Sequence, residues 1–449
     1  MLKSLINCFK IPDLRKKLLI TLGLLAVYRL GCFIPIPGIN IEALDEYFRK
    51  IAESQGVPTL FGFMNLFTGG AFRRLTIFAL GIMPYISASI IMQLLTAVVP
   101  YLEKLSKEGR AGYLKINQYA RVLTLFLCII QGFFIALWLE NPGQRFSNIV
   151  ENPGWGFRLN TIITLACGSI FIMWLGEQLQ ERGVGGISLI IAVSIISRVP
   201  AALSYLGMLL RGKAPFSGEW DILKLIVLFV IWIGVVIGVV LMTQAQRRVQ
   251  IQYARRIVGR RVYGGAVTYL PIRVDQAGIL AIIFAQAVLS FPATIATFFP
   301  GSKMQSLFKI FFVRNIWYNL IYAGLIIFFM YFYTAIVFNP TEISNNLKKS
   351  GGFIPGVRPG RQTADFLDYV VTRITFVGAL YIAFIALFPD IVMGWFKLPS
   401  YMIASFFGGT TLLIVVGVML DTMRQIESQL LLRHYEGFTK SGRLRGRRW

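Results

Sequence analysis

The sequence predicts an all-α polytopic membrane protein, and three observations support this fold class. Of the 449 residues, 56% are hydrophobic, and the mean hydropathy is +0.65, well above the level of a soluble globular protein. Many apolar runs reach the roughly 20 residues that a helix needs to cross a bilayer. The segments between these runs alternate between strongly and weakly basic, as expected when basic loops stay in the cytoplasm.

Ten transmembrane helices are expected. Their predicted ranges are 17–36, 76–99, 119–139, 159–178, 187–207, 222–243, 278–299, 315–338, 371–389 and 402–422. Five spans followed by five place the two halves in opposite orientations, and an inverted pair around a central site recurs among membrane transport proteins. The predicted regions are an N-terminal tail, two five-helix halves and a basic C-terminal tail, at residues 1–16, 17–210, 222–422 and 423–449.

The basic residues orient these helices. Roughly two thirds of the 45 Lys and Arg residues fall on the side that holds the N-terminus, which places both termini in the cytoplasm. The net charge of +24 is explained in part by this topology and by contact with anionic phospholipid headgroups. Acidic partners or ribosomal RNA would account for the rest. The first apolar run reaches full span length without a small-residue cleavage site, so it is predicted to be an uncleaved span.

Residues 61–73 are predicted to form a short re-entrant helix. The apolar stretch Phe61–Phe67 covers only about a third of a spanning helix, so it must dip into the membrane and turn back. Backbone at membrane depth that does not span survives only when it is buried in protein or lines an aqueous cavity. The segment therefore implies a cavity. The next span, Ile77–Leu95, is a candidate wall of that cavity, with Ile82 and Ile86 on one helical face.

Seven short motifs, spread in order over much of the chain, carry a resemblance to a known family. They are Phe33–Gly38, Thr68–Ala71 with Ile77–Leu95, Met173–Gln178, Phe291–Ala296, Val337–Pro340, Asn346–Gly351 and Gly356–Gly360. Together they resemble the SecY family, the protein-conducting channels of the Sec translocon. The resemblance implies two inverted five-helix halves around a central pore, a re-entrant plug helix, and sideways opening between the second and seventh spans.

A channel for unfolded chains needs a flexible, aliphatic constriction that excludes ions at rest. Ile187 and Ile191 repeat the spacing of Ile82 and Ile86, and the family pattern adds Ile283 and Ile414 to complete a six-isoleucine ring. For any single isoleucine, a place in the helix core or against lipid remains the alternative. The resemblance assigns the plug to ten residues: Phe61, Phe63, Met64, Asn65, Leu66, Phe67, Thr68, Gly69, Gly70 and Ala71.

Polar side chains on the second and seventh spans are candidates for the lateral gate, because they could bridge a closed seam and release it for an apolar signal helix. The candidates are Ser87, Gln93, Phe284 and Gln286. Ordinary hydrogen bonding between helices is the alternative for each polar one. The chain departs from the family pattern at Gly185–Gly186, where an asparagine is missing, and at Asp275, Ala281 and Gln286.

Two cytoplasmic loops stand apart, at residues 244–274 and 339–370. In the first, Val249, Ile251 and Tyr253 alternate with polar residues, which predicts a projecting β-hairpin. The second is too rich in Gly and Pro for one continuous helix. In the SecY family, loops at these positions receive the SecA motor ATPase or the ribosome. The candidate docking residues are Arg247, Arg248, Arg255, Arg256, Arg260, Arg261 and Arg358.

Absent motifs limit the reaction class. The sequence has one histidine, His434, and no phosphate-binding loop, nucleophile elbow or metal-spaced cluster. The four cysteines predict neither a disulfide framework nor a metal site. We therefore expect that the protein is not an enzyme and binds no cofactor, and that a partner supplies the energy for its activity. Glu177, Asp390 and Asp421 fall near span ends, whereas a gradient-driven carrier usually keeps a carboxylate near the midplane.

The sequence thus predicts a passive, gated pore. The resemblance implies that this pore lies in the bacterial plasma (inner) membrane, passes unfolded polypeptides and releases signal or transmembrane segments into lipid. The resemblance implies SecE and SecG as membrane subunits, SecA and the ribosome with its RNA as motors or donors, and signal sequences with secretory polypeptides as cargo. A secondary transporter of a small solute is the alternative function. A membrane scaffold that anchors partners is a third hypothesis, although it would not need a re-entrant segment.

Overall fold

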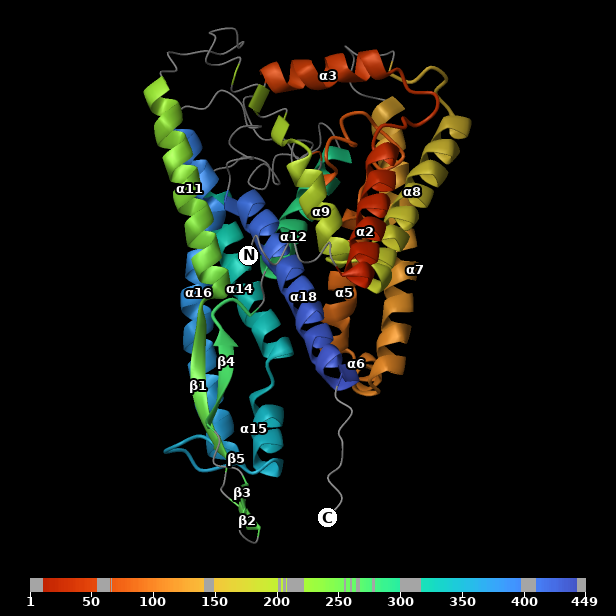
Figure 1. Cartoon of the computed structure of the whole chain (residues 1–449). Helices are drawn as coiled ribbons and strands as arrows, with labels where there is room; N and C mark the ends of the chain where they lie inside the picture. Colours follow the sequence, from red (N-terminus) through yellow and green to blue (C-terminus); the bar gives the residue numbers. More distant parts are fainter. Residues whose placement is uncertain are drawn as a thin grey trace. The chain divides into compact units, whose positions relative to one another are not determined.

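A computed structural model describes residues 11–54, 65, 67–140, 149–200, 203–204, 207, 222–253, 256–258, 261–263, 267–276, 279–298, 316–396 and 409–441. Helices make up most of it (Figure 1). The chain divides into two compact units. Unit 1 comprises Met1–Ser204 and Val418–Trp449, and unit 2 comprises Tyr205–Gly417.

Unit 1 is built from helices throughout the described residues. They are α2 (Pro12–Gly31), α3 (Ile41–Ser54), α5 (Met83–Val98), α6 (Pro100–Lys107), α7 (Arg110–Glu140), α8 (Trp155–Arg182), α9 (Gly186–Ile196) and the C-terminal part of α18 (Gly409–Ser441). Prolines stand in the first turn of α2, α5 and α6, where the missing N–H would have no intrahelical partner. At Val99 the chain bends by 98° between α5 and α6.

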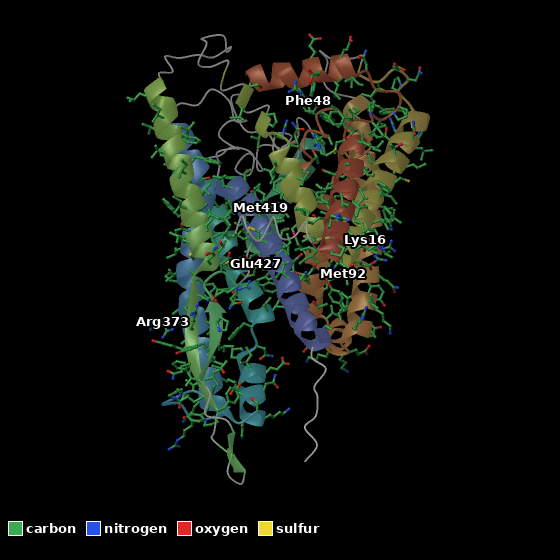
Figure 2. All side chains as sticks on the ribbon, viewed as in Figure 1. Lys16, Phe48, Met92, Arg373, Met419 and Glu427 are labelled. Carbon is green, nitrogen blue, oxygen red and sulfur yellow. The ribbon has the colours of Figure 1, made fainter. Side chains whose placement is uncertain are left out.

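A helix outside the predicted spans, α3, lies across the ends of the other unit 1 helices (Figure 1). Its buried face carries Leu44 and Tyr47, which join the core of the unit. The Tyr47 ring meets Trp138 of α7 edge-on, with 5.6 Å between ring centroids. Figure 2 shows Phe48 on the side of α3 that faces these helices, and its ring lies 6.2 Å from the ring of Phe72. These aromatic contacts fix α3 on the unit.

The start of α9 depends on two glycines that follow the fourth span. Gly185 and Gly186 have φ angles of +86° and +59°, in the left-handed region that side chains other than glycine rarely adopt. The Gly185 N–H donates to Oε1 of Gln425 on α18 at 2.9 Å, and the Val184 N–H donates to Oγ1 of Thr21 on α2 at 3.0 Å. The turn is thereby tied to the first and last helices of unit 1.

Unit 2 combines long helices with a small antiparallel sheet. Its elements are α11 (Ile222–Gln244), β1 (Gln246–Tyr253), β2 (Arg256–Val258), β3 (Arg261–Tyr263), β4 (Val267–Arg273), α12 (Ile279–Phe298), α14 (Ile316–Val337), α15 (Pro340–Lys349), β5 (Gly352–Phe353), α16 (Arg361–Phe396) and the start of α18. The predicted hairpin is confirmed, because β1 pairs with β4 from Gln246↔Arg273 to Gln252↔Val267. The sheet order is β4-β1-β5.

The alternation of apolar and polar residues that predicted the hairpin is also confirmed by the burial of the side chains on β1. Val249 and Ile251 are buried and Gln250 between them is exposed. Val249 packs with Ile272, Ile354 and Leu367 in one apolar cluster. The loop at residues 339–370 therefore supplies part of the core beneath the loop at residues 244–274.

The structure agrees with a membrane fold. Among the described residues, five helices are long and apolar enough to cross a membrane, or six if the bent pair α5 and α6 is one span. Helix α11 is the most apolar of them, and few of its residues are buried. Leu223, Phe229, Val230 and Leu241 are each more than half exposed, as expected of a helix that faces lipid. The count of ten spans stays a prediction.

Three predicted spans extend well beyond the helices observed. The first was expected to reach residue 36, but α2 ends at Gly31, and Pro35 forms a bridge to Thr76. The second was expected from residue 76, but α5 begins at Met83, because Gly81 has φ +59° and Pro84 occupies the first turn. The fifth was expected to run unbroken to 207, but α9 ends at Ile196 and two turn residues follow.

Candidate functional site

The re-entrant segment, defined here as Asn65 with residues 67–82, occupies the place of the predicted plug. Asn65 and Phe67 are helical, and the chain then follows turns until α5 begins. Phe67, Thr68 and Ala71 are buried, with exposed fractions of 6%, 1% and 0%. The other predicted plug residues with described positions, Gly69 and Gly70, have φ angles of +63° and +96°. Phe61, Phe63, Met64 and Leu66 lie outside the described residues.

Hydrogen bonds within the segment close its turns. The backbone carbonyl of Asn65 accepts from the Gly70 N–H at 3.0 Å, and its side-chain Oδ1 accepts from the Arg73 N–H at 3.2 Å. Thr68 Oγ1 accepts from the Phe72 N–H at 3.2 Å. The Thr76 N–H donates to the Ala71 carbonyl at 3.1 Å. The segment therefore satisfies much of its own backbone, which a non-helical chain at membrane depth requires.

Two glycines on neighbouring helices leave room for the re-entrant segment to pack closely. A Cβ added to Gly31 of α2 would lie 2.0 Å from the Phe78 ring, and one added to Gly168 of α8 would lie 1.9 Å from the Ile77 carbonyl oxygen. The Phe78 ring stacks between Tyr28 of α2 and Phe171 of α8, at centroid distances of 5.9 and 6.0 Å. Sequence reasoning missed both glycines. In the sequence, each of these glycines could have been noticed as a small residue inside a long apolar run.

Polar side chains also hold the segment. Arg73 forms an ion pair with Asp45 of α3, with both Nε and Nη2 at 2.7 Å from Oδ1. Arg29 of α2 donates from Nη1 to the Gly69 carbonyl at 3.4 Å and to Ser197 Oγ at 3.0 Å. Arg198 donates from Nη1 to the Asn65 carbonyl at 3.2 Å. The sequence showed Arg29 and Arg198 as charges inside predicted spans but gave no indication of their partners.

The predicted ring isoleucines fall in both units. In unit 1, Ile82 and Ile86 sit one turn apart at the start of α5, where the Ile86 N–H donates to the Ile82 carbonyl at 3.1 Å. Ile191 of α9 is buried, whereas Ile187 packs against α8, because a Cβ at Gly176 would lie 2.6 Å from its Cγ1. In unit 2, two further members are buried: Ile283 and Ile414. The ring as a whole stays a prediction.

The candidate gate residues have different surroundings. On α5, Ser87 is half-buried and Gln93 is exposed. On α12, Gln286 is half-buried, while the Phe284 ring packs on α14, 5.8 Å from the Phe329 ring and 5.1 Å from the Tyr333 ring. Phe284 thus has a structural role within unit 2, and the gate itself stays a prediction.

The two loops that are predicted to be cytoplasmic form one surface rather than two. Strand β5, from the second loop, pairs with the end of β1, with Gln252 opposite Phe353. Arg358 is exposed on a turn whose neighbours are fixed, because Thr363 Oγ1 donates to the Arg358 carbonyl at 2.9 Å and Ser344 Oγ donates to the Gly360 carbonyl at 2.6 Å.

The remaining docking candidates follow the first loop. Arg247 and Arg248 are exposed on β1. Arg256 and Arg261 lie in β2 and β3, and their side chains are not among those described. Arg255 and Arg260 lie outside the described residues. The docking role of the set stays a prediction.

Two ion pairs tie helix ends in unit 1. Glu177, near the end of α8, accepts from Arg121 Nη2 at 2.8 Å. Glu140, at the end of α7, accepts from Arg158 Nη2 at 2.6 Å and from the Gly154 N–H at 3.0 Å. The hydrogen bond from Arg158 holds the pKa of Glu140 below its ordinary value. Among the described residues, no group of three His, Cys, Asp or Glu side chains could hold a metal ion.

The chain is similar to known proteins over almost its whole length. The family model described as SecY matches residues 76–423. The protein translocase subunit SecY of Thermotoga maritima is 43% identical over 447 residues, which cover 98% of this chain and 99% of the relative. The protein of the same description from Escherichia coli strain K12 is 45% identical over 440 residues, covering 97% and 96%.

Solved structures give the same likeness in fold. One described as "The structure of a protein conducting channel" matches with a TM-score of 0.62 and 18% identity, covering 92% of each chain. Sec61 in the canine ribosome-channel complex from the endoplasmic reticulum matches with a TM-score of 0.58 and 18% identity, again covering 92% of each chain.

Proposed function

The chain belongs to the SecY family, and we propose that it is the channel subunit through which unfolded polypeptides cross a bacterial plasma membrane. The observation that carries this function is the similarity of nearly the whole chain to subunits named protein translocase SecY. The fold supports it, since the structural neighbours are protein-conducting channels. The chain contains no motif that would supply energy, so a partner drives transport.

The channel we propose is passive and gated. The isoleucine ring, Ile82, Ile86, Ile187, Ile191, Ile283 and Ile414, forms a narrow aliphatic waist that stretches around a passing chain and excludes water at rest. The re-entrant segment adds apolar bulk as the plug. Signal and transmembrane segments leave sideways into lipid at a gate that includes Ser87, Gln93, Phe284 and Gln286. Phe284 packs firmly on α14, so we assign it a structural rather than a mobile role in the gate.

The partners we propose follow the exposed cytoplasmic surface. The arginines of the β1–β4 hairpin and Arg358 suit acidic protein surfaces and RNA phosphates, which exposed guanidinium groups bind with paired hydrogen bonds. The ribosome is one such partner, and a Sec61 channel of the same fold is described in a ribosome complex. The SecA motor ATPase is the other, and SecE and SecG complete the membrane complex. Both termini lie in the cytoplasm, and basic loops contact anionic phospholipids.

Reconstitution tests the function. The chain, purified with its native membrane partners, is placed in lipid vesicles with the motor ATPase, ATP and a radiolabelled secretory polypeptide. We expect the polypeptide to become protected from external protease only when ATP is present. A matched set of vesicles receives small solutes without the motor. Saturable uptake of a solute together with no protected polypeptide would instead establish a secondary transporter.

A further inference from the structure

Two arginines that are far apart in the sequence bind the backbone of the re-entrant segment. Arg29 of α2 reaches the Gly69 carbonyl, and Arg198, just after α9, reaches the Asn65 carbonyl. Both fall inside predicted spans, where charged side chains are costly and usually functional. Neither forms an ion pair with a carboxylate among the described residues. Their charge is directed at carbonyl oxygens of the segment.

The backbone approaches α9 closely at this point. A Cβ at Gly69 would lie 3.1 Å from the Ser194 backbone and 3.1 Å from Arg29 Nη1. A hydrogen-bonded chain stiffens the contact. Ser194 Oγ donates to the Ile190 carbonyl at 2.8 Å, so the 2.6 Å bond between Ser194 Oγ and the Tyr28 hydroxyl has Tyr28 as its donor.

Ser197 completes the arrangement. Its Oγ accepts from Arg29 Nη1 at 3.0 Å and donates to the Ser194 carbonyl at 2.6 Å. Ser197 also marks the break in α9, where the helix ends at Ile196. After this break, Ser197 binds Arg29 and Arg198 binds the Asn65 carbonyl. A continuous helix would carry residues 197 and 198 along its axis instead.

We propose that Arg29 and Arg198 form a latch that sets the energy needed to displace the plug. This inference rests on the proposed function, and it assigns to these arginines a positioning role in gating. At rest Arg29 donates to the Gly69 carbonyl, and Arg198 donates to the Asn65 carbonyl, which also accepts from the Gly70 N–H. When the segment moves into water on opening, its carbonyls gain water as a partner, and the arginines lose theirs. The latch therefore favours the closed state only.

The test uses Arg198→Met, which keeps much of the length of the side chain and removes its donors. Resting openings are recorded in planar bilayers that contain the complex with its native membrane partners. We expect spontaneous openings to rise roughly tenfold or more, the change that follows loss of a hydrogen bond from a charged donor to a buried acceptor. Arg29→Met should act in the same direction but less, because its bond to Gly69 is longer. Arg198→Lys, which keeps one charged donor, should restore part of the seal.

A matched control lies in the same segment. Arg74 is exposed, and its guanidinium sits 5.0 Å from the centroid of the Phe33 ring; it donates to no carbonyl in the part of the chain that the structure describes. Arg74→Met removes the same charge, and we expect openings at the level of the parent channel. Equal effects of the Arg74 and Arg198 variants would show that net charge, rather than a latch, sets the seal.

Cysteine labelling separates release of the plug from general loosening. In a background without native cysteines, Ala71→Cys reports on the segment and Leu139→Cys on the neighbouring core; both positions are buried, at 0% and 1% exposure. With Arg198→Met, a water-soluble maleimide should react faster at 71 and at an unchanged rate at 139. Faster reaction at both, or at neither, would overturn the latch. A parent channel that protects no secretory polypeptide with motor and ATP would refute the proposed function itself.

Discussion

The arginines of unit 1 and those on the β4-β1-β5 sheet and its adjoining turn in unit 2 are used in opposite ways. Around the re-entrant segment, Arg29, Arg73 and Arg198 each donate to a group of the same unit. In unit 2, Arg247 and Arg358 are exposed, and the described part of that unit gives them no ion pair. The first set holds the chain's own backbone and helices, whereas the second is available to a partner.

This difference shows why the net charge of the chain does not reveal which arginines bind a partner and which bind the chain's own backbone. Exposed arginines on a fixed turn suit a binding surface, because little further ordering is needed when a partner arrives. Arginines bonded inside the fold contribute instead to the balance between conformations. The two sets should therefore respond differently to the same substitution: one in partner-driven transport, the other in the resting seal.

The largest expected effect is a labelling reaction that occurs from one side of the membrane only. It tests on which side of the membrane β1 and the segment before α8 lie. Gln250 on β1 and Asn152 before α8 are both exposed. With native cysteines removed, Gln250→Cys should react with a membrane-impermeant thiol reagent only from the cytoplasmic face, and Asn152→Cys only from outside. Reaction of both from one face would refute the predicted topology. Gly352 is a poor position for this probe, because a Cβ there would lie 3.1 Å from the Tyr253 ring.

A second prediction concerns the exposed set. Arg358→Glu should lower motor-driven transport of a secretory polypeptide at least about tenfold, because it removes a planar donor and adds repulsion toward an acidic partner. Complex assembly and melting temperature should not change, since Arg358 is exposed. Transport and stimulation of the motor's ATPase are measured in the same vesicles.

The control for this change is Arg361→Glu. Arg361 begins α16, where a negative charge near the helix N-terminus is favourable, and the net charge changes equally. An equal loss in both variants would assign the effect to overall charge rather than to Arg358. Full ATPase stimulation with Arg358→Glu would exclude it as a coupling residue.

The sequence predicted local patterns well and distant contacts poorly. The period of two at Val249 and Ile251 was enough to predict the hairpin, because alternation is a property of one strand. The pairing of β5 with β1 had no such signal, since Gly352–Phe353 is too short to show a period. The apolar run at residues 76–99 hid the late start of α5, because hydropathy does not register the φ angle of Gly81. Pro84 was the available signal.

The candidate site shows the same limit. Arg29 and Arg198 were visible as charges in apolar runs, but the carbonyls that they bind lie 40 and 133 residues away in sequence. A backbone acceptor leaves no trace in residue type, so only the fold could reveal it. Ile187 is a similar case. Its spacing from Ile191 predicted a shared face, and the small residue opposite it, Gly176, decides that its side chain packs on α8.

A third, smaller effect is expected at the other buried arginine contact of unit 1. The Glu140 side chain is only 4% exposed and pairs with Arg158. Glu140→Gln should lower the melting temperature of the purified complex by roughly 3 °C, because Arg158 loses its charged partner. Glu151→Gln, an exposed change before the start of α8, is the control and should leave the melting temperature unchanged.

This effect should depend on pH in a defined direction. The pKa of Glu140 is lowered from its ordinary value of 4.5 by the hydrogen bond from Arg158. Its contribution to stability is therefore fully present above about pH 4.5 and disappears as the pH falls through the lowered pKa. The difference in melting temperature between parent and Glu140→Gln should be constant from pH 7 to 5 and shrink below that. A difference that grows on acidification would exclude the ion pair as its cause.

The smallest effect is expected at Asp45, which binds the re-entrant segment through an exposed ion pair. The Arg73 and Asp45 side chains are 37% and 57% exposed, and such pairs contribute about 0.2–1 kcal/mol. Asp45→Asn should therefore raise spontaneous openings by less than roughly sixfold, below the effect of Arg198→Met. The difference from the parent should vanish near 1 M salt, where exposed charges are screened within about 3 Å. Glu42→Gln, on the same helix, removes the same charge without breaking this pair. If Asp45→Asn opened the channel as much as Arg198→Met at high salt, the seal would depend on α3 rather than on Arg29 and Arg198.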